Sequence, residues 1–203
     1  MPRFSFFILL NVFSCALFAQ AKNDTIAAKY WKDPKYKAAN TAANIAKLGE
    51  EEKLVYYYLN LARMNPPLFA KTYVAAQMKK HLQEVGEESE YERSLYDTLL
   101  KMAPRPLLEY DSVEHRSAIC LAEELNRENR FSHERTNCKD NRGYECCSAG
   151  RSSALDIVML LLVDVGYLDA DHRRICLLPA NTRLGVAIGP HPKWKTIAVL
   201  DLN

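Results

Sequence analysis

Hydrophobic and aromatic residues recur at helical spacing through the first half of the chain, from residue 50 onward. The first helical pattern stops at Asn65-Pro66-Pro67, and Pro67 suits the first turn of a second helix because it lacks a backbone N–H group. Asp111 followed by Glu114 is typical of the start of another helix. The predicted helices cover residues 50–65, 67–82, 91–102 and 111–129.

The second half of the chain contains one strongly apolar helical segment and several extended segments. Residues 154–163 are apolar on nearly every side of a helix, so we expect this helix to be buried between other elements. Ser153 and Asp156 mark its start, and Gly166 is a natural stop. Together these elements predict an α+β fold with a small antiparallel sheet. Its predicted strands are residues 107–110, 142–146, 182–189 and 194–202.

The first twenty residues differ from the rest of the chain. Arg3 precedes an apolar run, residues 4–13, that is too short to span a membrane, and Ala19-Gln20-Ala21 fits a small-residue cleavage site. These features predict a secretory signal peptide over residues 1–20 and a protein that is secreted, periplasmic or at the cell surface. Lipid attachment at Cys15 is the less favoured alternative. No later segment is long enough to be transmembrane.

The segment between the leader and the first helix, residues 21–48, is rich in Ala and Lys and carries three aromatic side chains. We expect an arm that packs on the domain or stays mobile; the alternative is a basic aromatic arm that contacts a cell-surface polymer. The remaining residues, 49–203, are predicted to form one domain. The chain has 203 residues, of which 48% are hydrophobic, so it can bury one sizeable core.

The charge balance argues against a nucleic-acid partner. The formal net charge is +2, whereas nucleic-acid-binding domains usually carry a clear excess of clustered Lys and Arg. The composition leaves open which extracellular ligand or cell-surface component the protein binds.

Export changes the expected role of the cysteines, because thiols in an oxidising compartment pair more often than they bind metal. One candidate disulfide joins Cys138 to Cys146 or Cys147. A second candidate joins Cys120 to Cys176, and one thiol is left over. The sequence alone does not fix this connectivity.

Two histidines and two carboxylates lie near the ends of the apolar helix. His133 and Glu145 precede this helix, Asp164 stands in its last turn, and His172 follows it. Imidazole and carboxylate groups bind divalent metals and transfer protons near neutral pH. Asp164 is unfavourable for the dipole at a helix C-terminus, which indicates a specific partner. The other histidines are expected at exposed or helix-end positions: His81, His115 and His191.

Six short motifs follow one another between residues 49 and 203. They are Asn60 to Arg63, Pro106 to Leu108, Ser132-His133, Gly143 to Glu145, Asp171 to Arg173, and Leu184 to Val186. Their order and spacing resemble the CAP superfamily of cysteine-rich secretory proteins, antigen 5 and plant pathogenesis-related proteins, in its bacterial secreted branch. The resemblance implies a three-layer α-β-α sandwich.

The resemblance also implies a cavity. Its histidines would be His133 and His172, and Glu145 matches the glutamate beside the first of them. The second family glutamate has no counterpart at its own position, and Asp164 is the nearest carboxylate. Two departures indicate a modified cavity: Cys146 replaces the asparagine of the GEN-type motif, and Asp171 replaces the glycine of the GHR-type motif.

From this we expect a secreted, non-enzymatic protein whose His/Glu cavity binds a metal ion or a small, lipid-like ligand, or supports an extracellular interaction. A bound metal would be Zn²⁺, with His133 and His172 as ligands. One alternative is a metal-assisted or acid/base hydrolase that acts on peptide or cell-wall material. Another is a structural surface protein with a vestigial cavity.

Overall fold

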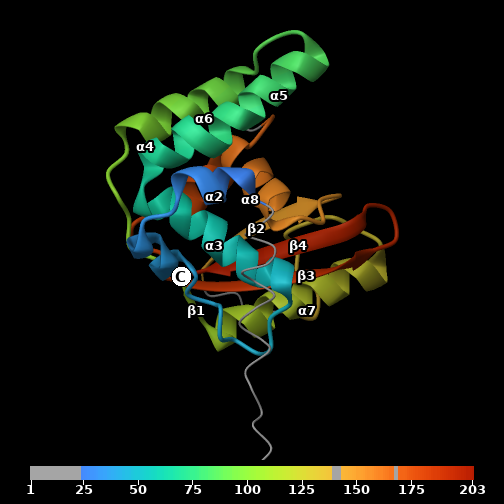
Figure 1. Cartoon of the computed structure of the whole chain (residues 1–203). Coiled ribbons are helices and arrows are strands. Elements are labelled where there is room, and N and C mark those ends of the chain that lie inside the picture. The colour runs from blue at the N-terminus through green and yellow to red at the C-terminus, as the bar shows by residue number, and fades with distance from the viewer. Residues whose placement is uncertain (1–23, 139–142, 167–168) are drawn as a thin grey trace, which may run out of the picture.

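The computed structural model describes residues 24–138, 143–166 and 169–203, so the predicted leader and Cys15 lie outside the described residues. The chain forms an α+β fold in which helices surround a small four-stranded sheet, as the sequence pattern predicted (Figure 1). None of the helices in these ranges is both long and apolar enough to cross a membrane.

Each predicted helix and strand has a counterpart in the structure, whereas the helices over residues 25–30, 34–39 and 171–177 had not been predicted. The elements in chain order are α2 (Thr25–Tyr30), the 3-10 helix η1 (Pro34–Ala39), α3 (Glu50–Met64), α4 (Pro66–Phe69), the π-helix η2 (Ala70–Val74), α5 (Ala75–Val85), α6 (Glu90–Lys101), β1 (Glu109–Tyr110), α7 (Ser112–Glu128), β2 (Tyr144–Ala149), α8 (Ala154–Val163), α9 (Asp171–Leu177), β3 (Arg183–His191) and β4 (Lys195–Leu202). The predicted starts are confirmed at α7 and α8. Asp111 accepts hydrogen bonds from backbone N–H groups in the first turn of α7, and Ser153 does the same for α8.

The sheet has the strand order β1-β3-β4-β2 and is mixed. Strand β4 pairs antiparallel with β3 and with β2, whereas β1 runs parallel to β3. The prediction of an antiparallel sheet is therefore wrong for β1. The direction of a strand relative to its neighbour depends on the path of the chain between them, and α7, β2, α8 and α9 all lie between β1 and β3. No local pattern encodes that path.

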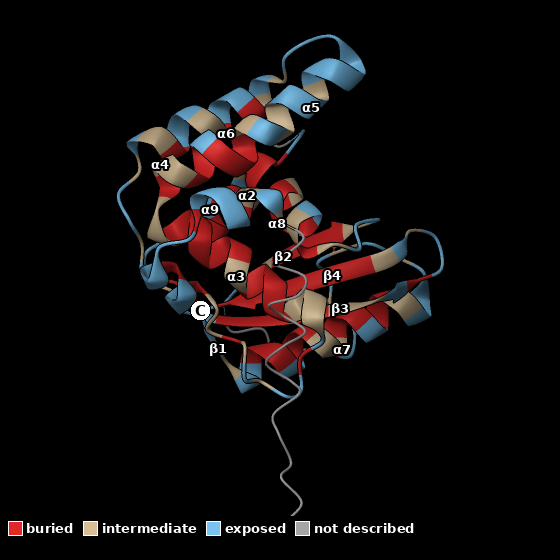
Figure 2. Ribbon diagram, viewed as in Figure 1, coloured by how far each residue is buried: buried red, intermediate tan, exposed pale blue. Residues whose placement is uncertain are grey.

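Helices cover both faces of the sheet and give the molecule three layers. Helix α7 packs along β3 and β4 on one face, and α3 and α8 pack against β3 and β2 on the other. Figure 2 shows buried residues concentrated where these helices meet the strands. Gly185 on β3 permits the closest approach of α7, because a Cβ atom there would lie 2.1 Å from backbone atoms of Glu114 and His115. Any larger residue would separate the two elements.

The N-terminal segment packs on the domain, which is one of the two forms expected for the arm. Trp31 and Tyr36 are buried in the larger hydrophobic cluster, together with residues of α3 and η2. The Asp24 carboxylate accepts hydrogen bonds from the hydroxyl groups of Tyr58, at 3.0 Å, and Tyr73, at 2.7 Å. Trp31 and Tyr36 therefore serve the core, whereas Tyr30 is exposed.

Two histidines expected at exposed positions are buried. The Nδ1 atom of His115 lies 2.9 Å from the carbonyl oxygen of Val186, across the contact between α7 and β3. The Nε2 atom of His191 lies 3.1 Å from the carbonyl oxygen of Arg130. Both predictions are wrong because each imidazole has a backbone partner on an element distant in sequence. Such a partner makes burial of a polar ring acceptable.

The disulfide connectivity also differs from the candidates drawn from the sequence. Cys120 on α7 is bonded to Cys138, while Cys146, Cys147 and Cys176 are buried thiols. The candidate pairs of Cys138 with Cys146 or Cys147, and of Cys120 with Cys176, are therefore wrong. The chain after α7 folds back along that helix, which brings Cys138 to Cys120 rather than to β2.

Candidate functional site

The four residues predicted to share a site come together from four parts of the chain. His133 lies in the loop after α7, Glu145 is on β2, Asp164 follows α8, and His172 is in the first turn of α9. The centres of the two imidazole rings are 6.3 Å apart, and the ring planes are inclined by 37°. The loop after α7 and the turn after α8 therefore face each other.

The first imidazole, His133, belongs to a network of ionisable groups. Its Nδ1 atom lies 2.6 Å from Oε1 of Glu145. Arg135 binds the same carboxylate, with 2.9 Å between its Nε atom and Oε2, and it also binds Asp201 on β4 at 2.9 Å. The His133 side chain is 57% exposed, whereas those of Glu145 and Asp201 are buried. Buried acids and one buried guanidinium thus support an accessible imidazole.

These contacts shift the pKa values of the network. The hydrogen bond to Glu145 raises the pKa of His133 above its ordinary value. Burial raises the pKa of Glu145, but hydrogen bonds from His133 and Arg135 outweigh burial and hold it below its ordinary value. Burial raises the pKa of Asp201 to about 6, against the lowering effects of Ser117 and Arg135. Glu145 is consequently ionised near neutral pH.

The second imidazole, His172, is held by the C-cap of α8. Asp164 has a left-handed backbone with φ of +57° and ends the helix two residues before the predicted stop at Gly166. Its Oδ1 atom lies 2.7 Å from Nδ1 of His172, and its Oδ2 atom accepts the backbone N–H of His172 at 2.9 Å. The sequence indicated a partner for Asp164, and the structure identifies it as His172.

The loop that carries His133 is fixed on α7 by a fully buried carboxylate. Glu124 accepts the backbone N–H groups of Thr136, at 2.8 Å, and Asn137, at 2.9 Å, and it forms an ion pair with Arg130. These backbone hydrogen bonds are the main reason that the pKa of Glu124 lies below its ordinary value. Together with the disulfide to Cys138, Glu124 determines where the loop lies.

A thiol adjoins the first imidazole–carboxylate pair. The Sγ atom of Cys147 lies 3.9 Å from Nδ1 of His133 and 3.8 Å from Oε1 of Glu145. One nitrogen, one oxygen and one sulfur atom from these residues lie within 4.8 Å of one another, which is a spacing that a metal ion can bridge. Burial raises the pKa of the Cys147 thiol, so without a metal it is protonated near neutral pH.

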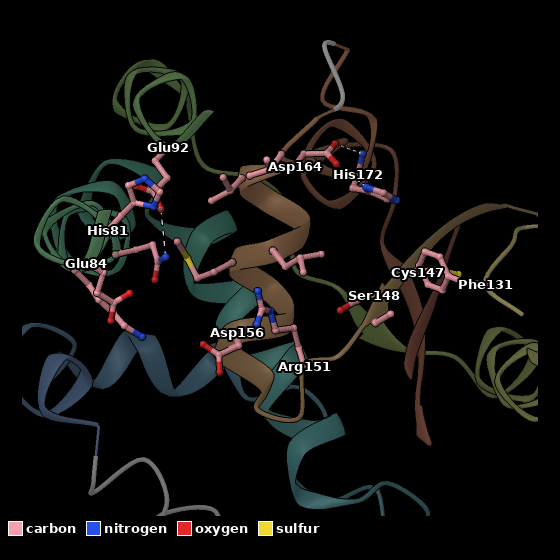
Figure 3. Close-up of a pocket in the computed structure, with 17 residues that line it drawn as sticks. His81, Glu84, Glu92, Phe131, Cys147, Ser148, Arg151, Asp156, Asp164 and His172 are labelled. Atoms are coloured by element: carbon pink, nitrogen blue, oxygen red, sulfur yellow. Dashed lines mark hydrogen bonds and ion pairs between the residues drawn. The ribbon is translucent and has the colours of Figure 1, made fainter. Parts of the chain in front are cut away.

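The second pair opens into a groove of about 720 Å³ (Figure 3). Side chains of α8 line the groove along its length, with Asp164 and His172 at one end. His81 on α5 and Glu92 on α6 form the opposite wall, so His81 faces this hollow rather than standing fully in solvent. The groove is lined by Cys147 as well, but not by His133 or Glu145.

The residues that sequence reasoning missed are those that hold the imidazoles in place. Arg135 stands two positions after His133, and this proximity in sequence could have indicated that Arg135 belongs to the same site. Asp201 is an acid in an otherwise apolar strand segment, and such a residue needs a buried partner. Glu124 carried no signal, because an acidic residue on an amphipathic helix is usually solvated.

No protein-family model matches the chain, and no curated protein sequence is similar enough to it to count as a match.

Proposed function

We propose that this chain is an extracellular, non-enzymatic binding protein of the CAP type whose two imidazole–carboxylate pairs together bind one divalent metal ion, Zn²⁺ in particular. The family part of this proposal is supported by the order of the six motifs. The metal part is supported by the way the four expected residues converge. One observation carries it: each imidazole has its Nδ1 atom on a carboxylate, and the two rings face each other at 6.3 Å.

The carboxylates prepare the rings for a metal. Histidines that bind zinc usually donate their second ring N–H to a carboxylate, which fixes the tautomer and makes the other nitrogen more basic. With Nδ1 bound by Glu145 or Asp164, a metal would bind each ring at Nε2. Two imidazoles that share one tetrahedral zinc ion place their ring centres roughly 5 Å apart, because each Zn–N bond is about 2 Å long. The observed separation of 6.3 Å is about 1 Å longer, so the two rings must approach each other by that amount to share an ion.

The charges near Glu145 favour a supporting role for it over direct coordination. Arg135 already binds this carboxylate, and a guanidinium beside a cation is unfavourable. Water would complete the coordination of an ion held by the two imidazoles, since the His133 ring is accessible. Cys147 is not assigned as a ligand of this ion, because its thiol adjoins Nδ1 of His133, on the side of the ring that Glu145 binds.

The same electrostatics argue for binding over hydrolysis. A general base works best with a pKa near the operating pH, and the pKa of Glu145 is shifted down, away from that range. The thiol beside His133 is buried, and its raised pKa makes it a poor nucleophile. Both groups are better suited to holding His133 and its ligand than to attacking a substrate.

Isothermal titration with Zn²⁺ in buffer without chelator or reductant tests the proposal. We expect one site in the unaltered protein and a loss of affinity of at least about tenfold in both His133→Ala and His172→Ala. His81→Ala is the matched control, since His81 lines the far wall of the same groove, and its affinity should not change. Equal, weak zinc binding by the unaltered protein and all three variants would contradict a metal site at His133 and His172.

Asp164→Asn examines the tautomer directly. An asparagine can keep one hydrogen bond to the backbone N–H of His172, but its amide group then donates to Nδ1. This places the ring proton on Nε2, where the metal would bind. We expect zinc affinity to fall by about 10- to 100-fold while the fold is retained. Unchanged affinity would mean that the metal does not use His172 in this way.

A further inference from the structure

Strand β2 places its two adjacent cysteines on opposite faces of the sheet. Cys146 belongs to the larger hydrophobic cluster, between the sheet and α8, and Cys147 to the smaller cluster, between the sheet and α7. Neighbouring residues of a strand point to opposite sides, so the two thiols have different partners. Cys147 adjoins the imidazole site, whereas Cys146 has no part in the proposed metal binding.

Cys146 meets a second buried thiol, Cys176 of helix α9. Both residues have 0% exposure and belong to the same cluster. The Sγ atom of Cys146 lies 4.0 Å from the carbonyl oxygen of His172, one helical turn before Cys176. The neighbouring thiol of Cys176, together with burial, raises the pKa of Cys146. Strand β2 and helix α9 are thus packed together, with Cys146 facing the helical turn that ends at Cys176.

We propose that Cys146 and Cys176 are a redox-active pair that closes a second disulfide between β2 and α9. The oxidant would be a small or protein disulfide, such as oxidised glutathione or an oxidoreductase. One cysteine, as thiolate, attacks a sulfur of the oxidant and forms a mixed disulfide, releasing one thiol. The second cysteine then attacks the mixed disulfide, which closes the Cys146–Cys176 bond and releases the other thiol. The protein loses two electrons and two protons, and the oxidant is reduced to two thiols.

The bond would join the two halves of the imidazole site. Strand β2 carries Glu145, which holds His133, and helix α9 carries His172. A bond between Cys146 and Cys176 would fix β2 and α9 relative to each other. Cys146 is one residue from Glu145, and Cys176 is one helical turn from His172. This inference does not depend on metal binding, because neither thiol is a proposed ligand.

Burial determines when the bond can form. Both thiols are inaccessible, so exchange with an oxidant is slow once the chain is folded. We therefore expect the bond to close during folding in an oxidising medium. In the folded, reduced protein it should close only as the structure opens locally.

The experiment is to refold the full chain with a mixture of oxidised and reduced glutathione, to block the remaining thiols, and to map the peptides by mass spectrometry without reduction. We expect two disulfides, Cys120–Cys138 and Cys146–Cys176, each lowering the mass by about 2 Da. Cys147→Ala should form both bonds, whereas Cys146→Ala should form the first alone. The thermal midpoint of Cys147→Ala should be higher when the protein is refolded with oxidant than when it is refolded without it. The same difference in Cys146→Ala measures the contribution of the Cys120–Cys138 bond alone. After this contribution is subtracted, the second bond should account for roughly 5–10 °C.

Two results would overturn the inference. In the first, the protein is refolded in oxidant and then denatured, and both Cys146 and Cys176 are alkylated although the Cys120–Cys138 bond has formed. In the second, a new bond uses Cys147 in place of Cys146. Because the Cys120–Cys138 bond reports on folding in every sample, a failure to fold is distinguishable from the absence of the second bond.

Discussion

The two imidazoles of the site are held in opposite ways. His133 is 57% exposed and depends on Glu145 of β2 and, through Arg135, on Asp201 of the distant strand β4. His172 is 15% exposed and depends on one aspartate eight positions earlier, which is itself the cap of a helix. One half of the site is thus fixed by long-range electrostatics and the other by local backbone geometry. The two halves should therefore respond differently to mutation and to pH.

Arg135→Ala should have the largest effect, and it attacks the half that contains His133. It leaves Glu145 and Asp201 buried without their shared cation, and breaking a buried ion pair in this way costs about 3–5 kcal/mol of unfolding free energy. Urea denaturation measures the loss. The control is Arg174→Ala, which removes an exposed ion pair on α9 and should cost less than about 1 kcal/mol. If the two variants were equally stable, the charged network would not be what holds the loop.

Asp164→Ala addresses the other half and should cost less, about 2 kcal/mol. It removes two hydrogen bonds to His172 and places alanine at a positive φ. Asp164→Asn should be milder, at about 1 kcal/mol or less, because asparagine tolerates the left-handed conformation. Denaturation midpoints of both variants against the unaltered protein make the comparison. A larger loss with asparagine than with alanine would contradict the role of local geometry.

The effect of replacing Glu124 should depend on pH. Its pKa in the folded state lies below the ordinary value, so its stabilisation is complete above the unfolded pKa and is lost as the pH falls through the folded pKa. The difference in unfolding free energy between the unaltered protein and Glu124→Gln should therefore be greatest near pH 7 and shrink towards pH 3. A difference that stays constant over this range would show that Glu124 acts without its charge.

The elements of this fold could be predicted from sequence where the signal is local. The apolar run of α8, the N-caps Asp111 and Ser153, and the pair of strands β3 and β4 are encoded within a few residues of each element. The direction of β1, the burial of His115 and the partner of Cys138 all depend on contacts between distant segments. Those features could not be obtained from periodicity or composition.

The site shows the same division. His172 and Asp164 lie eight positions apart, and the misplaced charge at the end of an apolar helix indicated that Asp164 has a partner. His133 and Glu145 were identified through the order of motifs. Their support by Arg135, Asp201 and Glu124 depends on strand register and on a loop that folds back, and neither can be derived from residue types alone.

We propose above all that two differently supported imidazoles form one site. Zinc titration of His133→Ala, His172→Ala and the double variant tests this directly. If both rings hold the same ion, the zinc-binding free energy of the double variant should be close to that of the weaker-binding single variant. The difference between the two should be no larger than a few tenths of a kcal/mol. Losses that add fully, or two separate zinc sites of which each single variant removes one, would contradict the claim.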